Sequence, residues 1–248
     1  MTGAVILGCG YVGKAVAAAW KPVLTVTATT TTPTRVSELE PLAHRVMVIH
    51  GNDEVGLRSL LQNQQIVLVS VGAPSSDAYE TTYLQTAKTL AQVLQDNASV
   101  QQVIYTGSYA VYGDRAGAWV DEETPVAPAN ANGEILAETE RILLSAASPT
   151  RNICIFRLGG IYGPGRELVK IFRRAAGTTR PGTGEDAANW VHLADIVGAI
   201  DFARQHHLNG IYNLVGNPPI TSRELLERVC HAHHLEPITW DASLPSVR

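Results

Sequence analysis

Short apolar runs alternate with stretches of helical spacing through the first two thirds of the chain. The runs are continuously apolar, which indicates strands that are buried on both faces. Between them, Tyr83–Leu94 and Ile135–Ala146 place apolar residues at helical spacing. Strands and helices in alternation favour a parallel sheet with right-handed crossovers. We therefore predict an α/β fold with a doubly wound parallel sheet. Its predicted strands are Ala4–Leu7, Val23–Ala28, Val46–His50, Ile66–Val71, Val103–Thr106 and Ile153–Leu158.

The alternation ends after the sixth strand, and the rest of the chain is predicted to form a small lobe. Asp195 is predicted to cap the next helix, and a strand is expected at Gly210–Val215. Thr221 and Glu224 have the spacing of a capping box that opens a final helix. We expect one domain over residues 1–248. Its lobe, about 159–190 and 216–248, would lie over the open edge of the sheet, where ligands bind in such folds.

Composition narrows the class of protein. The chain has 248 residues, is 45% hydrophobic and has a net charge of −4, which argues against a nucleic-acid or anionic-membrane partner. No apolar run approaches the ~20 residues of a membrane span, and the chain enters its first strand without a signal peptide. Three cysteines far apart indicate neither a disulfide framework nor a zinc site, so we predict a cytoplasmic protein. Three histidines beside Cys230 suit the end of the last helix, and no metal is predicted.

A glycine-rich motif follows the first predicted strand and opens a helical stretch, Lys14–Trp20. It reads Gly8-Cys9-Gly10-Tyr11-Val12-Gly13. One glycine permits a tight turn, one lets the backbone approach a pyrophosphate, and one lets the helix pack on the strand. The pyrophosphate binds the free N–H groups at the positive end of the helix. The motif therefore predicts a dinucleotide site. Its predicted cofactor-binding residues are Gly8, Gly10, Tyr11, Val12 and Gly13.

The residues after the second strand bear on which dinucleotide binds. A site for NAD usually has an Asp or Glu about 20 residues past the loop, to hold the ribose hydroxyls. Here the first acidic residue of the chain is Glu38, and the second strand runs into threonines that end at Arg35. Hydroxyls and an arginine suit a 2′-phosphate, which a carboxylate would repel. We predict NADP rather than NAD, with Thr29, Thr30 and Arg35 at the site. The alternative is a surface turn in which Thr34 caps the next helix.

Four later segments resemble, in order, the motifs of the extended short-chain dehydrogenases/reductases, the NAD-dependent epimerase/dehydratase group. They are Val103–Gly113, which resembles that group's fifth-strand signature, Phe156–Arg166, Trp190–Asp195 and Ile211–Asn213. Leu7 stands where the group usually has its first glycine. The resemblance implies an NAD(P)-binding Rossmann fold and a small-molecule substrate. It also implies a homodimer through the helices near 78–96 and 133–147, whose apolar stripes are needed for sheet packing too.

The catalytic centre departs from the family pattern. The family uses a Ser or Thr after the fifth strand and Tyr-x-x-x-Lys on the next helix, where the lysine lowers the tyrosine pKa for proton transfer. Ser108 matches the serine, but Asn132 stands at the tyrosine position and Leu136 at the lysine position. Asparagine cannot ionise and leucine supplies no charge. The chain therefore resembles an atypical member of the family.

Two functional interpretations follow. In the first, the chain is an NADP-dependent oxidoreductase or epimerase in which Ser108 orients the substrate, and Tyr109 or Tyr162 acts as the acid. In the second, it binds the dinucleotide without chemistry, as a redox sensor or structural partner. The short lobe suggests a substrate smaller than a nucleotide sugar, or none.

Several further residues are candidate contacts. Arg166 is a candidate for substrate or phosphate binding, and Tyr162 for substrate binding. Asn52 could contact the adenine as the family's Asp does, with turn formation as its alternative. Gly72 and Ala73, after the fourth strand, complete the predicted cofactor site.

Overall fold

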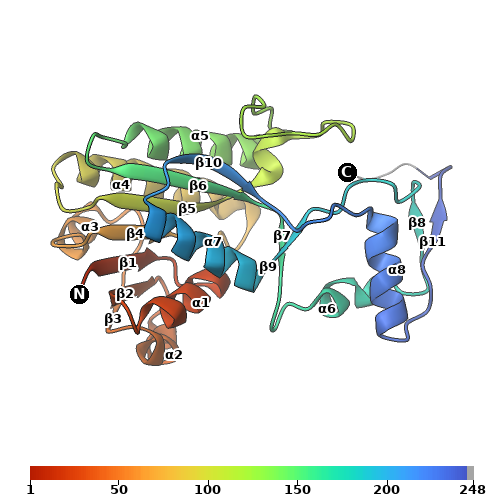
Figure 1. The fold of residues 1–248 in the computed structure, drawn as a ribbon, viewed down its shortest axis with the longest axis horizontal. Helices are drawn as coiled ribbons and strands as arrows, with labels where there is room; N and C mark the ends of the chain where they lie inside the picture. The colour runs from red at the N-terminus through yellow and green to blue at the C-terminus, as the bar shows by residue number, and fades with distance from the viewer. Residues whose placement is uncertain (245–248) are drawn as a thin grey trace.

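Residues 1–244 are described by a computed structural model, which contains a seven-stranded sheet (Figure 1). The strand order is β10-β6-β5-β4-β1-β2-β3, and every neighbouring pair is parallel. This confirms the predicted doubly wound sheet. The strands are β1 (Gly3–Leu7), β2 (Thr25–Thr30), β3 (Arg45–Val48), β4 (Ile66–Val69), β5 (Gln102–Ser108), β6 (Asn152–Leu158) and β10 (Gly210–Leu214).

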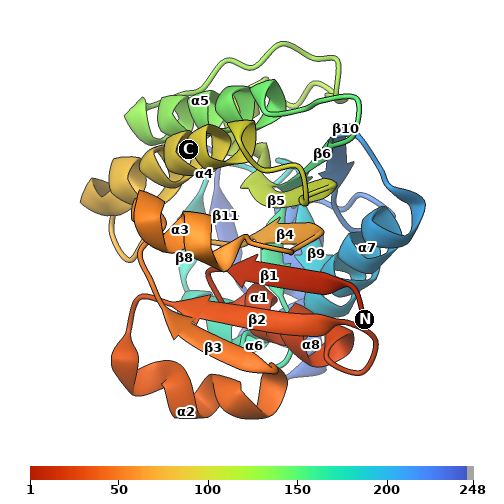
Figure 2. The same cartoon turned by 90° about the vertical axis from the view of Figure 1, so that its left-hand side faces the viewer.

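Helices cover both faces of the sheet, with α1 and α7 on one side and α3, α4 and α5 on the other (Figure 2). The helices are α1 (Tyr11–Trp20), α2 (Val36–Leu39), α3 (Glu54–Leu60), α4 (Thr86–Gln95), α5 (Ala131–Ser145) and α7 (Leu193–His206). Because successive side chains of a strand point to opposite faces, each strand contributes to both cores. In β1, Ile6 packs under α1 and α7, and Leu7 under α3 and α4. Burial on both faces explains the continuously apolar strands.

The C-terminal third adds a lobe beyond the carboxyl ends of the strands (Figure 1). A two-stranded parallel pair connects it to the sheet, and a second pair lies within it. The elements are β7 (Gly160–Tyr162), α6 (Leu168–Phe172), β8 (Thr179–Pro181), β9 (Trp190–His192), α8 (Ser222–Ala232) and β11 (Thr239–Asp241). Thr221 caps α8 as predicted, because its hydroxyl accepts a hydrogen bond from the Glu224 amide at 3.1 Å. The Glu224 carboxylate pairs with Arg228 rather than completing the capping box.

Several predicted boundaries need correction. The second strand does not begin at Val23, which lies in an exposed turn, and it continues through Thr30. The third strand ends at Val48 rather than His50. Asp195 does not cap α7, since the side chain of His192 accepts the capping hydrogen bond from Ala194. These differences arise because tertiary pairing, rather than local composition, decides where each element begins.

Candidate functional site

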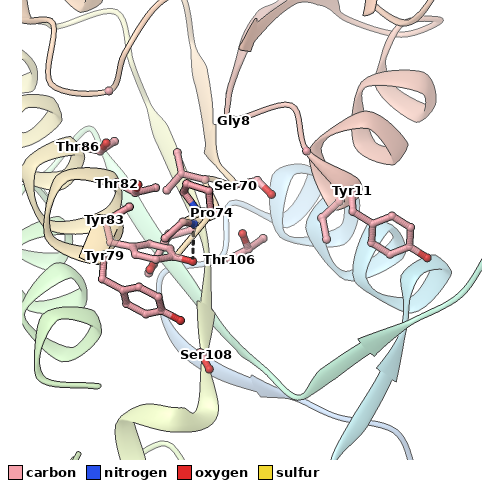
Figure 3. A pocket seen from close by; sticks show the side chains of 18 of the residues that line it. Gly8, Tyr11, Ser70, Pro74, Tyr79, Thr82, Tyr83, Thr86, Thr106 and Ser108 are labelled. Atoms are coloured by element: carbon pink, nitrogen blue, oxygen red, sulfur yellow. Dashed lines mark hydrogen bonds between the residues drawn. The ribbon is translucent and has the colours of Figure 1, made fainter. Parts of the chain in front are cut away.

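The candidate site is a cavity of about 880 Å³ at the carboxyl ends of the central strands. Its walls include the loops after β1, β4 and β5. From β1 the strand order continues outward through β2 and β3 on one side and through β4, β5 and β6 on the other, so the order reverses between β1 and β4. Such a switch point is where ligands bind in doubly wound folds. In Figure 3 the loop with Gly8 lies on one side and Tyr79 and Tyr83 on the other, with Ser108 on the strand end between them.

The three glycines of the loop have different surroundings. Gly8 has a φ of +84°, and a Cβ built on it would lie 2.7 Å from the carbonyl oxygen of Ser70. A Cβ on Gly13 would lie 2.5 Å from the carbonyl oxygen of Gly8, so this glycine lets α1 approach the loop. Around a Cβ on Gly10 nothing lies within 4 Å, because the backbone there faces the cavity. Gly13 itself does not line the cavity.

The N-terminal end of α1 opens onto the cavity through Gly10, Tyr11 and Val12. Its first turn has no acidic residue, and Gly10 provides no side-chain cap. Free N–H groups and the helix dipole therefore favour an anion here. Together with the open backbone at Gly10, this end of the helix fits the pyrophosphate of a dinucleotide.

The threonine segment divides into structural and cavity-facing residues. Thr29 is buried and holds the loop in place, accepting from the Gly8 amide and donating to the Ile6 carbonyl, each at 3.1 Å. Thr30 lines the cavity, as does Arg35. The hydroxyl of Thr29 therefore holds the glycine loop from its buried side. The cavity wall at this edge is formed instead by Thr30, Thr31 and Arg35.

Arg35 is fixed at the edge of the glycine loop. Its Nη2 donates to the Cys9 carbonyl and its Nε to Glu38, each at 3.0 Å. Lys14 also pairs with Glu38, and these two cations lower the pKa of that carboxyl, Lys14 more strongly. Two cations and one carboxylate leave the cluster with a net positive charge. Thr34 lies within the turn Pro33–Arg35 and does not cap α2, so the predicted Thr34 cap is wrong.

Asn52, Gly72 and Ala73 line the same cavity. Asn52 follows β3 near the outer edge, and a Cβ on Gly72 would meet nothing within 4 Å. The Ala73 amide donates to the Tyr83 hydroxyl at 3.4 Å. Burial is the largest cause of the raised pKa of Tyr83, so this phenol stays protonated near neutral pH.

Of Ser108, Tyr109 and Asn132, the residues at the predicted catalytic positions, only Ser108 lines the cavity. Ser108 ends β5, and its hydroxyl accepts from the Ala110 amide at 3.2 Å. Tyr109 is 43% exposed and lies outside the cavity wall, because the chain turns into a short 3₁₀ helix directly after β5. Asn132 does not line the cavity either, whereas Leu136, one turn further on α5, does.

Tyr79 is a cavity residue that the sequence did not reveal. It immediately precedes a π-helical turn, Glu80–Gln85, which leads into α4. Its ring packs against the cluster of Val111, Tyr112 and Leu136, and Leu136 is the residue at the position where the family has its lysine. The spacing of apolar residues reveals the helix, but the contact with α5 depends on the tertiary fold.

Tyr162 and Arg166 do not lie together. Tyr162 lines a second cavity of about 670 Å³ between β7, α6 and α8, where its ring centroid is 5.0 Å from that of His192. Arg166 lines the main cavity, with its guanidinium carbon 5.1 Å from the centre of the Tyr11 ring. The Gly163–Arg166 turn separates the two positions, and it brings Arg166 to the glycine loop.

A buried ion pair lies beneath the Ser108 end of the cavity. Arg157 Nη2 is 2.7 Å from Glu140 Oε2, and both side chains are at least 96% buried. The guanidinium also lies over the Tyr112 ring, 4.7 Å from its centre. Burial raises the pKa of Glu140, and Arg157 opposes this shift. The pair ties α5 to β6 and is already neutralised, so it provides no free charge to the cavity.

Thiol and metal chemistry find no support in the part of the chain that the structure describes. Cys9 is buried under the loop, and burial raises the pKa of its thiol to about 11, so it is not a thiolate near neutral pH. Among residues 1–244, no group of three His, Cys, Asp or Glu side chains could hold a metal ion. None of the described helices is long and apolar enough to cross a membrane.

Comparison with known proteins places this site in a family. Residues 4–215 match the sequence model of the NAD dependent epimerase/dehydratase family. The chain belongs to this family. The match confirms the resemblance on which the Rossmann fold and an NAD(P) cofactor were expected. The reaction and the choice between NAD and NADP depend on the individual residues of this chain.

Known relatives support the family and the fold. The protein YeeZ of Escherichia coli is 33% identical over 190 residues, which are 75% of this chain and 65% of YeeZ. The chain thus covers slightly less than two thirds of that relative. A functionally unknown conserved protein from Silicibacter pomeroyi DSS has a TM-score of 0.78 at 24% identity, covering 97% of this chain and 82% of that one. UDP-glucuronic acid 4-epimerase from Bacillus cereus, in complex with UDP-glucuronic acid and NAD, has a TM-score of 0.79 at 17% identity, covering 99% and 88%. At these identities the structural likeness shows the fold alone.

Proposed function

We propose that this chain is an NADP(H)-dependent oxidoreductase, or an epimerase-like enzyme, with a non-standard active site. One observation carries the proposal: a single cavity joins the glycine loop to Ser108 at the end of β5. That arrangement suits a dinucleotide at one end and a substrate oxygen at the other. The Bacillus cereus epimerase, which shares the fold, is seen with NAD, and this supports a cofactor of the same class.

The choice of NADP rests on the edge of the cavity formed by Thr30, Thr31 and Arg35. Hydroxyls and a guanidinium favour a 2′-phosphate. Glu38 is the acid that could oppose it, but Lys14 and Arg35 both pair with its carboxylate. The local charge therefore remains positive.

Ser108 and Tyr79 are the side chains that we assign to the substrate. Bound NADPH supplies a hydride. Ser108 would orient the substrate oxygen, and the Tyr79 phenol would donate the proton in place of the residue missing at Asn132. Both side chains line the cavity, and the described residues offer the Tyr79 hydroxyl no hydrogen-bond partner, so it is free to donate to a ligand.

We propose a substrate smaller than a nucleotide sugar. Between Gly163 and β9 the regular elements of the lobe are a five-residue helix, a three-residue 3₁₀ turn and a three-residue strand. This leaves little chain to enclose a nucleotide. Calorimetry with UDP-glucose tests the point, because saturable micromolar binding would contradict it.

The alternative is a dinucleotide-binding sensor without chemistry. The observation that favours it is Leu136, which faces the cavity where the family has a lysine. A sensor requires that the cofactor bind one conformation of the lobe more tightly than another. NADPH binding without turnover of any carbonyl compound supports the sensor.

Calorimetric titration of the purified protein with NADPH and with NADH tests the proposed cofactor. We expect micromolar binding of NADPH and at least about tenfold weaker binding of NADH, a difference of 1.4 kcal/mol. Preference for NADH would refute the assignment of Arg35 to a 2′-phosphate. Binding of neither would refute the oxidoreductase itself. If NADPH binds, a panel of small aldehydes and ketones tests turnover.

We also propose a homodimer through α4 and α5, as expected from the family resemblance. The two helices pack side by side over one face of the sheet (Figure 2). Sedimentation velocity gives the mass directly, and a purely monomeric boundary at micromolar concentration would exclude this dimer.

A further inference from the structure

We propose that Arg166, on the lobe, is a clamp for the cofactor pyrophosphate rather than a substrate contact. The inference rests on the proposed dinucleotide function. Arg166 follows β7 in the chain, yet it lines the same cavity as the glycine loop. Its guanidinium lies over the ring of Tyr11, the first residue of α1. It therefore extends from the lobe to the end of α1 that favours an anion.

A closed turn fixes where Arg166 lies. The Gly163 amide donates to the Arg166 carbonyl at 3.2 Å, and the Arg166 amide donates to the Gly163 carbonyl at 2.9 Å. Within the turn, Gly165 has a φ of +82°, which a side chain would disfavour. The Tyr11 hydroxyl donates to the Pro164 carbonyl at 3.0 Å. The turn and the glycine loop are thus joined by one hydrogen bond and one cation–π contact.

The charge of Arg166 is available to a ligand. Its neighbour Glu167 is held by Lys170 at 2.8 Å and by the Gly165 amide at 3.0 Å. These interactions, the Lys170 contact foremost, lower the pKa of Glu167 to about 2. Within residues 1–244 no carboxylate pairs with Arg166 itself. A guanidinium fork matches phosphate geometry, so a diphosphate is the ligand chemistry that this position fits.

Arg35 and Arg166 reach the glycine loop and the start of α1 from two different segments of the chain. Arg35 comes from the segment after β2 and bonds to the Cys9 carbonyl, while Arg166 comes from the lobe and covers Tyr11. Their expected signatures differ. Arg35 should distinguish NADPH from NADH through the 2′-phosphate. Arg166 should affect both equally, because both dinucleotides carry the same pyrophosphate.

Calorimetric titration of Arg166→Gln with NADPH and NADH tests the clamp. We expect both dissociation constants to rise by the same factor, about tenfold or more, which is 1.4 kcal/mol per tenfold. Arg35→Gln should weaken NADPH alone. Arg173→Gln is the matched control, since it removes an exposed arginine of the same lobe that lines neither cavity, and it should bind like the wild type. Arg166→Lys keeps the charge without the fork and should be intermediate.

The outcomes separate the clamp from the proposed function. Wild-type affinity of Arg166→Gln for both dinucleotides, within twofold, would overturn the clamp while leaving the oxidoreductase intact. A loss of affinity for NADPH alone would also overturn the clamp, since the arginine would then contact the 2′-phosphate. Failure of the wild type to bind either dinucleotide would overturn the proposed function and the clamp with it. Thermal unfolding of each variant controls for the fold, with Arg166→Met as a second neutral substitution.

Discussion

Gly8 and Gly10 lie two residues apart in the loop, and alanine should affect stability at the first and cofactor binding at the second. Gly8→Ala places a side chain at a φ of +84° and 2.7 Å from the backbone of residues 70 and 71. The left-handed backbone costs roughly 1–2 kcal/mol, and overpacking against fixed atoms adds about 1–3 kcal/mol. For a chain of this size each kcal/mol lowers Tm by roughly 2–4 °C. We therefore expect Gly8→Ala to lower Tm by about 4–20 °C.

Gly10→Ala should keep the fold and lose the cofactor. Gly10 has a φ of −81° and a ψ of −145°, and nothing lies within 4 Å of the added carbon, so the methyl group meets no steric clash. Stability should therefore change by no more than about 1 kcal/mol. The added methyl occupies the space through which a pyrophosphate approaches the backbone, so NADPH affinity should fall at least tenfold, about 1.4 kcal/mol.

Differential scanning fluorimetry and NADPH calorimetry on both variants provide the two measurements. The two variants control for one another, since each adds one methylene-sized group to the same loop. If Gly10→Ala bound NADPH as the wild type does, the loop would not approach the cofactor, and the reasoning from its open backbone would fail. If Gly8→Ala had the same Tm as the wild type, the backbone of residues 70 and 71 would move to accommodate the methyl group, and the predicted steric cost would be refuted.

Two further substitutions test the ion pair and the proposed acid. Glu140→Gln leaves Arg157 buried without a counter-charge, and it should lower the free energy of unfolding in urea by about 3–5 kcal/mol. The control is Glu138→Gln, in an exposed pair on the same helix, which should leave the urea midpoint unchanged. Equal midpoints for the two would show that the buried pair is not needed. Tyr79→Phe should lower carbonyl reduction about 10²–10⁴-fold with NADPH affinity within twofold of the wild type, and Tyr109→Phe, outside the cavity, should retain activity. Unaltered turnover of Tyr79→Phe would remove this phenol from the mechanism.

The sheet could be predicted because its signals are local. Continuous apolar runs identify strands buried on both faces, and each predicted strand of the sheet is present within a few residues. The short strands of the lobe could not be found in this way. Thr179 of β8 pairs with Thr239 of β11, sixty residues later, so three-residue strands are fixed by a distant partner rather than by their own composition.

The same distinction separates the two ends of the cavity. The glycine loop is a contiguous motif, and the structure places Gly10 and Arg35 at the cavity as expected. Tyr79 has no such motif, because what matters is its packing against the cluster of Val111, Tyr112 and Leu136, whose members come from other parts of the chain. Thr29 is a case in which the position in the sequence misleads. Its hydroxyl was expected at a phosphate, but it points inward and accepts a hydrogen bond from the Gly8 amide.

The loss of the lysine should slow proton transfer at the Ser108 end in both directions. The basic side chains that line the cavity, among the residues described, are Arg35, Arg166 and His50, from the segments after β2, β7 and β3. Arg157 is nearer but is neutralised by Glu140. Because a catalyst speeds a reaction and its reverse by the same factor, the missing cation should slow carbonyl reduction and alcohol oxidation together. Leu136→Lys restores a cation at that position, and we expect it to raise NADPH consumption with an aldehyde and NADP⁺ reduction with the matching alcohol in parallel, both measured at pH 7. Unchanged rates in both assays would show that a cation at this position does not assist the reaction.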